Sequence, residues 1–288
     1  MNGSLKEAKL VQLSVIIDGR LDSVRARQVA ILADRLGLAG VWLRQPWPLA
    51  VPAVGWDPLA VPAVSWDPLA VPAVSEDPLA APGSGLRIPP GIIVDADAAD
   101  AADAANAADT GWLNRVRTPR RIALTGTPAA IARWQQLIGP GVDLAVSLPA
   151  GDSEWHAVFI PCAPGRDLAA EVSAAVAVAA GRPVLAEVAV SVGRTAAEAR
   201  ARADMDELFA PDQQGLFGTL EECQATAARL GQAGVTELVC CLPLASDLPD
   251  VLAQVRSIAI GAAVLRPGEP PSAAPPPPAG WGGRRSRW

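Results

Sequence analysis

A tight turn between an apolar segment and a helical one offers the best anion-binding site in the chain. The turn runs Thr125-Gly126-Thr127-Pro128. Gly126 allows close backbone approach to a ligand, Thr127 suits the N-cap of the next helix, and Pro128 suits its first position. Because free N–H groups at a helix start favour negative charge, this turn is predicted to hold a phosphate. The same residues could equally cap the helix without a ligand, and both interpretations stay open.

Proton-transfer groups are scarce in this sequence, which has one histidine and no tyrosine. The histidine, His156, stands at the beginning of a predicted strand, where we expect a structural role. The motifs Gly-x-Ser-x-Gly, Walker A and Gly-x-Gly-x-x-Gly do not occur, so acyl transfer, phosphoryl transfer and classical dinucleotide binding lack support. A chain so poor in acids and bases suits a cofactor that brings its own reactivity. No catalytic residue is assigned.

Composition narrows the class of protein. The net charge is −6 and the pI is about 4.9, which argues against a nucleic-acid surface. The four cysteines have neither Cys-x-x-Cys pairing nor a nearby histidine, so we expect reduced thiols and no metal site. No apolar run is long enough to span a membrane. These features predict a cytoplasmic protein with no nucleic-acid or membrane partner.

Strand-like and helical segments alternate along the chain, as in α/β proteins. The predicted strands are 10–17, 40–43, 86–94, 121–124, 142–148, 155–162, 184–192 and 237–242. The predicted helices are 22–36, 128–137, 167–180, 196–209, 220–230 and 248–260. Eight strands favour a small or incomplete (β/α)8 TIM barrel, although an open doubly wound sheet gives a similar alternation.

One helix-to-strand joint occurs twice, as Leu36-Gly37-Leu38-Ala39-Gly40-Val41 and as Leu230-Gly231-Gln232-Ala233-Gly234-Val235. A glycine ends each helix in the left-handed cap conformation before an apolar strand begins. This repetition predicts the same supersecondary unit near both ends of one domain.

Two Pro-rich segments fall outside this pattern. A decapeptide containing Val-Pro-Ala-Val and Asp-Pro-Leu-Ala occurs three times over 51–80, and we predict a loop insertion spanning 47–80. Its Trp56 and Trp66 could cover a ligand, although a tolerated duplication of a surface loop is the simpler interpretation. Residues 266–288 are predicted to be a disordered tail, in which Pro275 to Pro278 could dock on a partner. The predicted domain spans 1–265.

Residues that directly follow strands are the candidates for a site, because barrel enzymes act at the carboxyl ends of their strands. Of the arginines at such positions we take Arg44 and Arg166 as candidates; Arg20 and Arg194 also follow strands.

The chain resembles the bacterial luciferase-like monooxygenases, a (β/α)8 family that uses FMN or the deazaflavin coenzyme F420. The resemblance depends on the order of several segments. They are Leu13 to Ile17, Leu36 to Arg44, Asp77 to Ala80, Leu86 to Gly91, Ser191 to Arg200, and Phe217 to Cys223 leading into the second joint. Gln45-Pro46-Trp47 stands where many members have a histidine or an acid, and the Gly-Gly-Arg strand of the family is absent between Asp109 and Arg120.

This resemblance implies an oxidoreductase or monooxygenase acting on a small organic substrate, with FMN or coenzyme F420 across the barrel mouth. The cofactor phosphate would be held by Thr125, Gly126 and Thr127, with added positive charge from Arg44 and Arg166. The loop insertion at 47–80 would exclude water from the reactive ring. A homodimer is compatible with it. The alternative is a degenerate, non-catalytic barrel that serves as a binding or scaffold protein. The repeats and the shortened middle of the chain favour that alternative.

Overall fold

The computed structural model describes residues 11–18, 21, 23–44, 91–97, 121–138, 141–147, 155–206, 209, 214–243 and 247–264. The decapeptide repeats, with Trp56 and Trp66, and the Pro-rich tail lie outside these residues. The segment between Asp109 and Arg120 lies outside them as well.

Eight parallel strands close into a barrel, so the predicted TIM-barrel fold is confirmed. They are β1 (Gln12–Asp18), β2 (Val41–Arg44), β3 (Gly91–Asp95), β4 (Arg121–Thr125), β5 (Asp143–Val146), β6 (Ala157–Ile160), β7 (Val184–Val192) and β9 (Glu237–Cys241). Pairing of β6 with β7, of β7 with β9 and of β9 with β1 completes the circle. An open doubly wound sheet has no such closure.

One further strand, β8 (Gly215–Gly218), was missed by the sequence analysis. Among the described strands it pairs with the last part of β7, from Ala189 to Val192, beyond the part of β7 that pairs with β6. Four residues with glycines at both ends have too little apolar alternation to stand out in a sequence.

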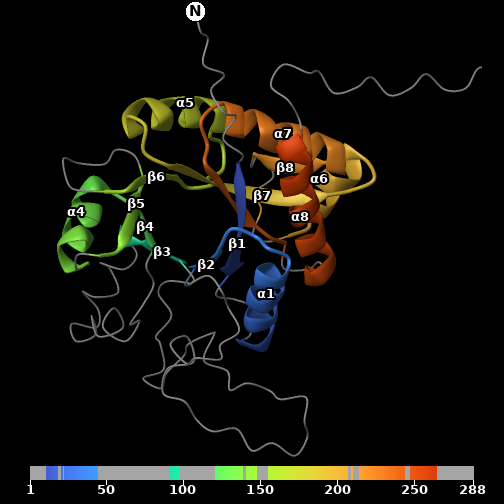
Figure 1. Cartoon of the computed structure of the whole chain (residues 1–288), viewed down its shortest axis with the longest axis horizontal. Coiled ribbons are helices and arrows are strands. Elements are labelled where there is room, and N and C mark those ends of the chain that lie inside the picture. The colour runs from blue at the N-terminus through green and yellow to red at the C-terminus, as the bar shows by residue number, and fades with distance from the viewer. Residues whose placement is uncertain are drawn as a thin grey trace, which may run out of the picture.

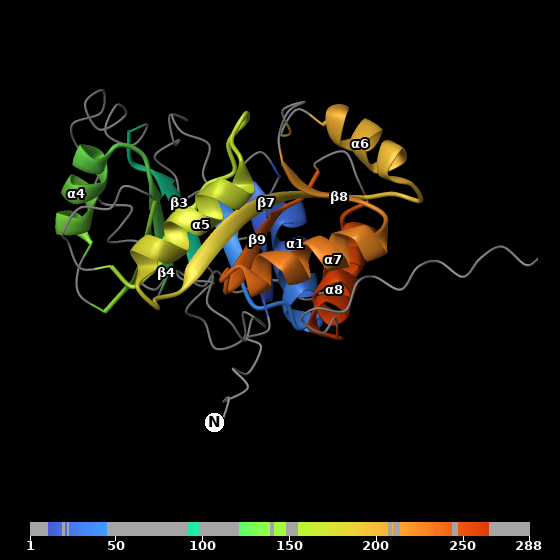
Figure 2. The same cartoon turned by 90° about the horizontal axis from the view of Figure 1, so that it is seen from above.

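The described helices surround the barrel (Figures 1 and 2). They are α1 (Ser23–Arg35), α4 (Pro128–Leu137), α5 (Leu168–Ala179), α6 (Ala196–Asp204), α7 (Leu220–Gln232) and α8 (Leu248–Val264). Helices α7 and α8 lie side by side, and α1 packs next to α8. Helix α6 ends at Asp204, with Met205 as its C-cap. This end lies five residues before Phe209, the predicted end of the helix.

Both repeated joints end a helix in the same hydrogen-bond pattern, but at different positions of the repeated sequence. The first glycine of the repeat, Gly37, ends α1, whereas its counterpart Gly231 lies inside α7 and the second glycine, Gly234, ends that helix. After α1, Gly37 has φ +69°, its N–H donates to the carbonyl of Asp34, and the N–H of Leu38 donates to Ala33. After α7, Gly234 has φ +111°, and Gly234 and Val235 donate to Gly231 and Leu230 with the same spacing. This is the Schellman pattern of helix termination. It delivers the chain to β2 in one case and β9 in the other.

The core has an inner and an outer part because successive strand residues face opposite sides of the barrel wall. Outward-facing aliphatic residues pack against the helices. The middle of the barrel is filled by apolar residues that include Ile16, Ile93, Ala123, Phe159 and Val239. Polar side chains lie inside the barrel on both sides of this apolar layer, and they define its two ends chemically.

Candidate active site

An ion pair joins two strands inside the carboxyl-terminal mouth of the barrel. The guanidinium of Arg44, the last residue of β2, pairs with the carboxylate of Glu187 on β7. Glu187 is 2% exposed and Arg44 is 31% exposed, so the acid is buried and the base is partly open to the mouth. The backbone N–H of Cys162 donates to the same Glu187 oxygen over 3.3 Å. The predicted candidate Arg44 therefore lies at the mouth, but it already has a partner.

The surroundings of Arg44 keep its positive charge. Burial alone lowers the pKa of the guanidinium, but the charge of Glu187 and the hydrogen bond to it raise the pKa more, with smaller contributions from Cys241 and Asp18. The net result is a pKa above the usual range for arginine. Charged residues of β1, β2 and β7, namely Asp18, Arg44 and Glu187, thus lie together at the mouth.

The Thr125-Gly126-Thr127 turn precedes α4, as predicted, but an internal carboxylate fills its anion site. Asp97 accepts a hydrogen bond from the Thr127 N–H at 2.7 Å and another from the Thr127 hydroxyl at 2.6 Å. The hydroxyl also caps α4 by accepting from the Ala130 N–H at 3.4 Å. Gly126 has φ +126°, and a Cβ placed on it would lie 2.9 Å from an Asp97 oxygen. The turn has the geometry of an anion site, and Asp97 provides the anion.

The remaining predicted candidate, Arg166, lies in the loop between β6 and α5. It forms an exposed ion pair with Glu171 at 2.9 Å. Arg44 and Thr125 end strands that are separated only by β3, whereas Arg166 follows β6, two strands beyond β4. The structure thus places all of these candidates at carboxyl ends of strands, each with an internal partner.

His156 lies at the amino-terminal end of the barrel, as expected from its position before β6. The ring Nδ1 of His156 accepts a hydrogen bond from the backbone N–H of Leu144 at 3.2 Å. The backbone N–H of His156 donates to the Leu144 carbonyl at 2.8 Å. The histidine therefore helps to join β5 to β6.

Three carboxylates lie outside the predicted set of site residues: Asp97, Glu187 and Glu237. Glu187 and Glu237 are buried inside the barrel. Each is a charged residue within an otherwise apolar strand, and such a residue needs a partner when it is buried. The sequence shows each acid within its apolar strand, but it does not show which residues pair with Glu187 and Glu237.

A cavity of about 610 Å³ lies at the end of the barrel opposite to this site, lined by Arg121, His156 and Glu237 among others. Barrel enzymes place their chemistry at the carboxyl ends of the strands. For the active site we therefore favour the Arg44 end over this cavity.

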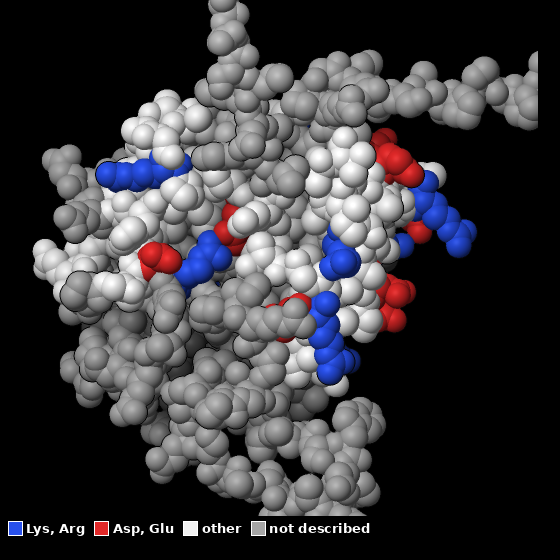
Figure 3. Space-filling view, viewed as in Figure 1, with Lys and Arg blue, Asp and Glu red and all other residues white. Residues whose placement is uncertain are grey.

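Figure 3 shows no surface patch of a single charge sign among the described residues, because basic and acidic side chains are interspersed on this face. In the described part of the chain, no helix is long and apolar enough to cross a membrane. The same residues contain no group of three or more His, Cys, Asp or Glu side chains that could hold a metal ion.

No protein-family model and no curated protein sequence matches the chain. Solved structures do match it. An F420-dependent secondary alcohol dehydrogenase, in complex with an F420-acetone adduct, superimposes with a TM-score of 0.52 at 12% identity, over 88% of this chain and 99% of that one. Apo-MsnO8 gives a TM-score of 0.43 at 15% identity over 88% and 98%. Dihydropteroate synthase from Xanthomonas albilineans gives 0.36 at 16% over 89% and 94%.

At these identities the likeness concerns the fold alone, and only the dehydrogenase, with its higher TM-score, carries an argument. The chain has the TIM-barrel architecture of that enzyme along nearly its whole length. The match shows the (β/α)8 barrel fold that the sequence resemblance implied.

Proposed function

We propose that the protein is an oxidoreductase that uses coenzyme F420 or FMN to act on a small organic substrate. The observation that supports this proposal best is the superposition on an F420-dependent alcohol dehydrogenase over 99% of that chain. The ordered sequence segments that resemble the luciferase-like family point the same way. A reduced flavin or deazaflavin supplies its own redox chemistry when bound, which suits a barrel mouth with few proton-transfer groups.

The predicted phosphate site does not fit a cofactor phosphate with Asp97 in its present position. Both donors of Thr127 that a phosphate would use are committed to the Asp97 carboxylate. A phosphate at this turn would also meet the negative charge of Asp97, which disfavours a second anion at such short range. Cofactor binding at Thr125, Gly126 and Thr127 thus requires Asp97 to move away, and we derive no catalytic step through the cofactor.

A second candidate function follows from the same contact. If Asp97 stays in place, the barrel is a non-catalytic descendant that binds another molecule or serves as a scaffold. The Arg44–Glu187 pair supports this alternative too, because the acid neutralises a positive charge that would otherwise attract an anionic cofactor.

A thermal-shift titration with FMN and, separately, with coenzyme F420 distinguishes these functions. A ligand at about a hundred times its dissociation constant adds about 2.7 kcal/mol of stability, so the melting temperature should rise with the concentration of one cofactor. Riboflavin, which lacks the phosphate of FMN, is the control for the phosphate contribution. Unchanged melting temperatures with both cofactors up to millimolar concentration would reject the oxidoreductase and leave the scaffold.

A further inference from the structure

The cavity at the amino-terminal end of the barrel has the size of a small-molecule site. Its volume of about 610 Å³ lies within the usual range for ligand pockets. The first residues of five strands line it, namely Gln12, Arg121, Asp143, Ala157 and Glu237. It lies across the apolar layer from Arg44 and is separate from the candidate active site.

Much of the cavity wall is apolar. The apolar lining residues are Trp42, Leu144, Ala145, Ala157, Pro183 and Leu185. Four of them, Trp42, Ala145, Ala157 and Leu185, belong to the inner core of the barrel. Such a wall favours a ligand with a hydrocarbon or aromatic body.

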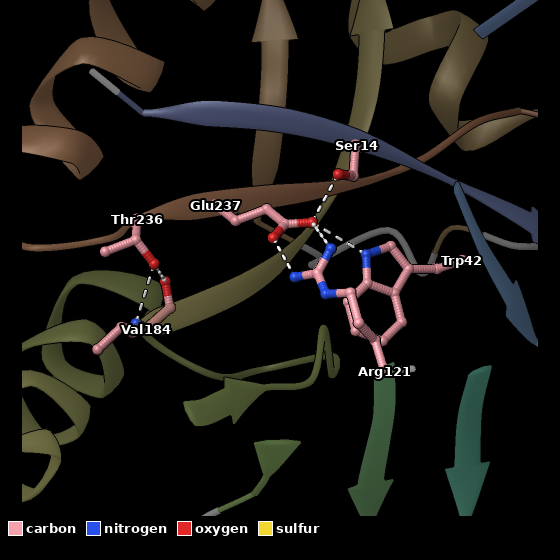
Figure 4. A network of polar contacts seen from close by, with 6 residues as sticks. All are labelled: Ser14, Trp42, Arg121, Val184, Thr236 and Glu237. Carbon is pink, nitrogen blue, oxygen red and sulfur yellow. Dashed lines mark hydrogen bonds and ion pairs between the residues drawn. The ribbon is translucent and has the colours of Figure 1, made fainter. Parts of the chain in front are cut away.

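The positive charge of Arg121 is already neutralised inside this cavity. Its guanidinium donates to both carboxylate oxygens of Glu237, at 2.5 and 3.3 Å. The same carboxylate accepts from the Ser14 hydroxyl at 2.5 Å and from the Trp42 indole N–H at 3.0 Å. Figure 4 shows these side chains converging on Glu237, and Arg121 lies 4.6 Å above the centre of the Trp42 ring. An anionic ligand would therefore have to compete with Glu237 for Arg121.

The neutral polar groups of the lining are also largely occupied. The Thr236 hydroxyl donates to the carbonyl of Val184 at 2.9 Å and accepts from its N–H at 3.1 Å (Figure 4). Because the Nδ1 atom of His156 accepts from Leu144, the neutral imidazole carries its proton on Nε2.

Asp143 is the one charged side chain of the described lining without an internal partner. It is the first residue of β5 and the cross-strand partner of Arg121, and its exposed side chain has no hydrogen-bond or ion-pair partner among the described residues. Since Arg121 and Glu237 cancel, Asp143 leaves the described lining with one uncompensated negative charge at neutral pH.

We propose that this cavity binds a small apolar amine. The ammonium group pairs with Asp143, and the hydrocarbon body packs against Trp42, Leu144 and Leu185. The charge of Asp143 selects an amine over an acid of the same size, and the apolar wall selects an aryl or alkyl amine over a polar one. This site is independent of the oxidoreductase proposed above, because it requires no cofactor and lies at the other end of the barrel.

The single histidine gives a direct test, because its imidazole protons form one identifiable set of NMR signals. The probes are 2-phenylethylamine and 3-phenylpropanoate, which have the same ring and similar length but opposite charge. We expect the amine to shift the His156 signals saturably, and the acid to bind at least about tenfold more weakly. Binding of both probes with equal affinity would overturn the proposal, and so would an amine that leaves the His156 signals unmoved at millimolar concentration.

Two variants locate the bound amine. Asp143→Asn keeps the side-chain shape but removes the charge. Because the ion pair between the ammonium group and Asp143 is exposed, we expect about fivefold weaker amine binding. Asp250→Asn, at an exposed acid on α8, is the matched control and should bind as the wild type does. Ala157→Leu fills the cavity and should abolish binding. An Asp143→Asn variant with unchanged affinity would overturn the assignment even if Ala157→Leu failed to fold.

Discussion

Arg44 and Glu187, which are 143 positions apart in sequence, form an ion pair across the inside of the barrel mouth. The closed barrel brings β2 and β7 to opposite sides of one interior, so both side chains can point inward and meet. Glu187 is almost fully buried, and a buried carboxylate without a partner is costly. The pair therefore couples two sides of the site at which the oxidoreductase would act.

Removing one member of this pair should destabilise the fold more than removing both. Arg44→Met leaves Glu187 buried without its cation, and we expect a loss of about 3 kcal/mol, at the low end for buried pairs because Arg44 is partly exposed. Arg44→Met combined with Glu187→Leu should regain most of this loss, since apolar side chains can replace a buried pair without large cost. Urea unfolding of the four proteins of this cycle measures the coupling. Additive losses in the double variant would show that the pair contributes nothing.

Removing the carboxylate of Asp97 should open the turn before α4 to an external anion. In Asp97→Ala the N–H and hydroxyl of Thr127 lose their acceptor, while Thr127 can still cap α4 through Ala130. We expect about tenfold tighter binding of inorganic phosphate, and of whichever of FMN and coenzyme F420 binds the wild type. Calorimetric titration measures this change, with Asp250→Ala as the control for lost charge. If phosphate binds wild type and Asp97→Ala equally, the turn is only a helix cap.

Glu237 should be the most sensitive acid of the described barrel interior, because three side chains donate to it. Glu237→Leu leaves Arg121 without its ion-pair partner and Ser14 and Trp42 without their acceptor. We expect a loss of about 3 to 4 kcal/mol. Glu237→Gln keeps an oxygen acceptor and should lose about half as much. Chemical denaturation followed by circular dichroism checks this order, and equal losses in the two variants would assign the effect to the lost negative charge alone.

Buried thiols should make the protein less stable in alkaline solution. Burial, helped by the charge of Glu222, raises the pKa of Cys223 to about 12, and burial also raises the pKa values of Cys240 and Cys241. Between pH 9 and 12 the unfolded chain therefore releases thiol protons that the folded chain retains. The free energy of unfolding should fall as pH rises through this range, by up to about 1.4 kcal/mol per pH unit for each such thiol. Cys223→Ala should reduce the slope of stability against pH, and an unchanged slope would contradict the raised pKa.

The sequence was sufficient for the elements that depend on local patterns. The apolar segments from Leu10 to Ile17 and from Val184 to Val192 coincide with β1 and β7 to within two residues. Thr127 was predicted as an N-cap, and Thr195 and Thr219 also cap their helices. Helix caps and glycine joints are encoded within a few neighbouring residues, so one sequence is enough to recognise them. The short strand β8 lacked such a signal.

Partners across the barrel were beyond sequence reasoning. The sequence offered Arg44 and the Thr125–Thr127 turn as positive or donor groups, and both lie at carboxyl ends of strands. It could not identify Glu187 and Asp97 as the groups that already satisfy them. Ser14 and Glu237 likewise form a hydrogen bond although they are 223 residues apart.

The alternation of strands and helices, the helix caps and the scarcity of proton-transfer groups can all be recognised in the amino-acid sequence. Which charges are free and which are paired becomes clear only in the folded barrel. The physical reason is that a side chain's partner inside a barrel depends on strand register and closure, which are global properties of the fold. Burial then makes each internal pairing strong enough to determine what a ligand can find at either end of the barrel.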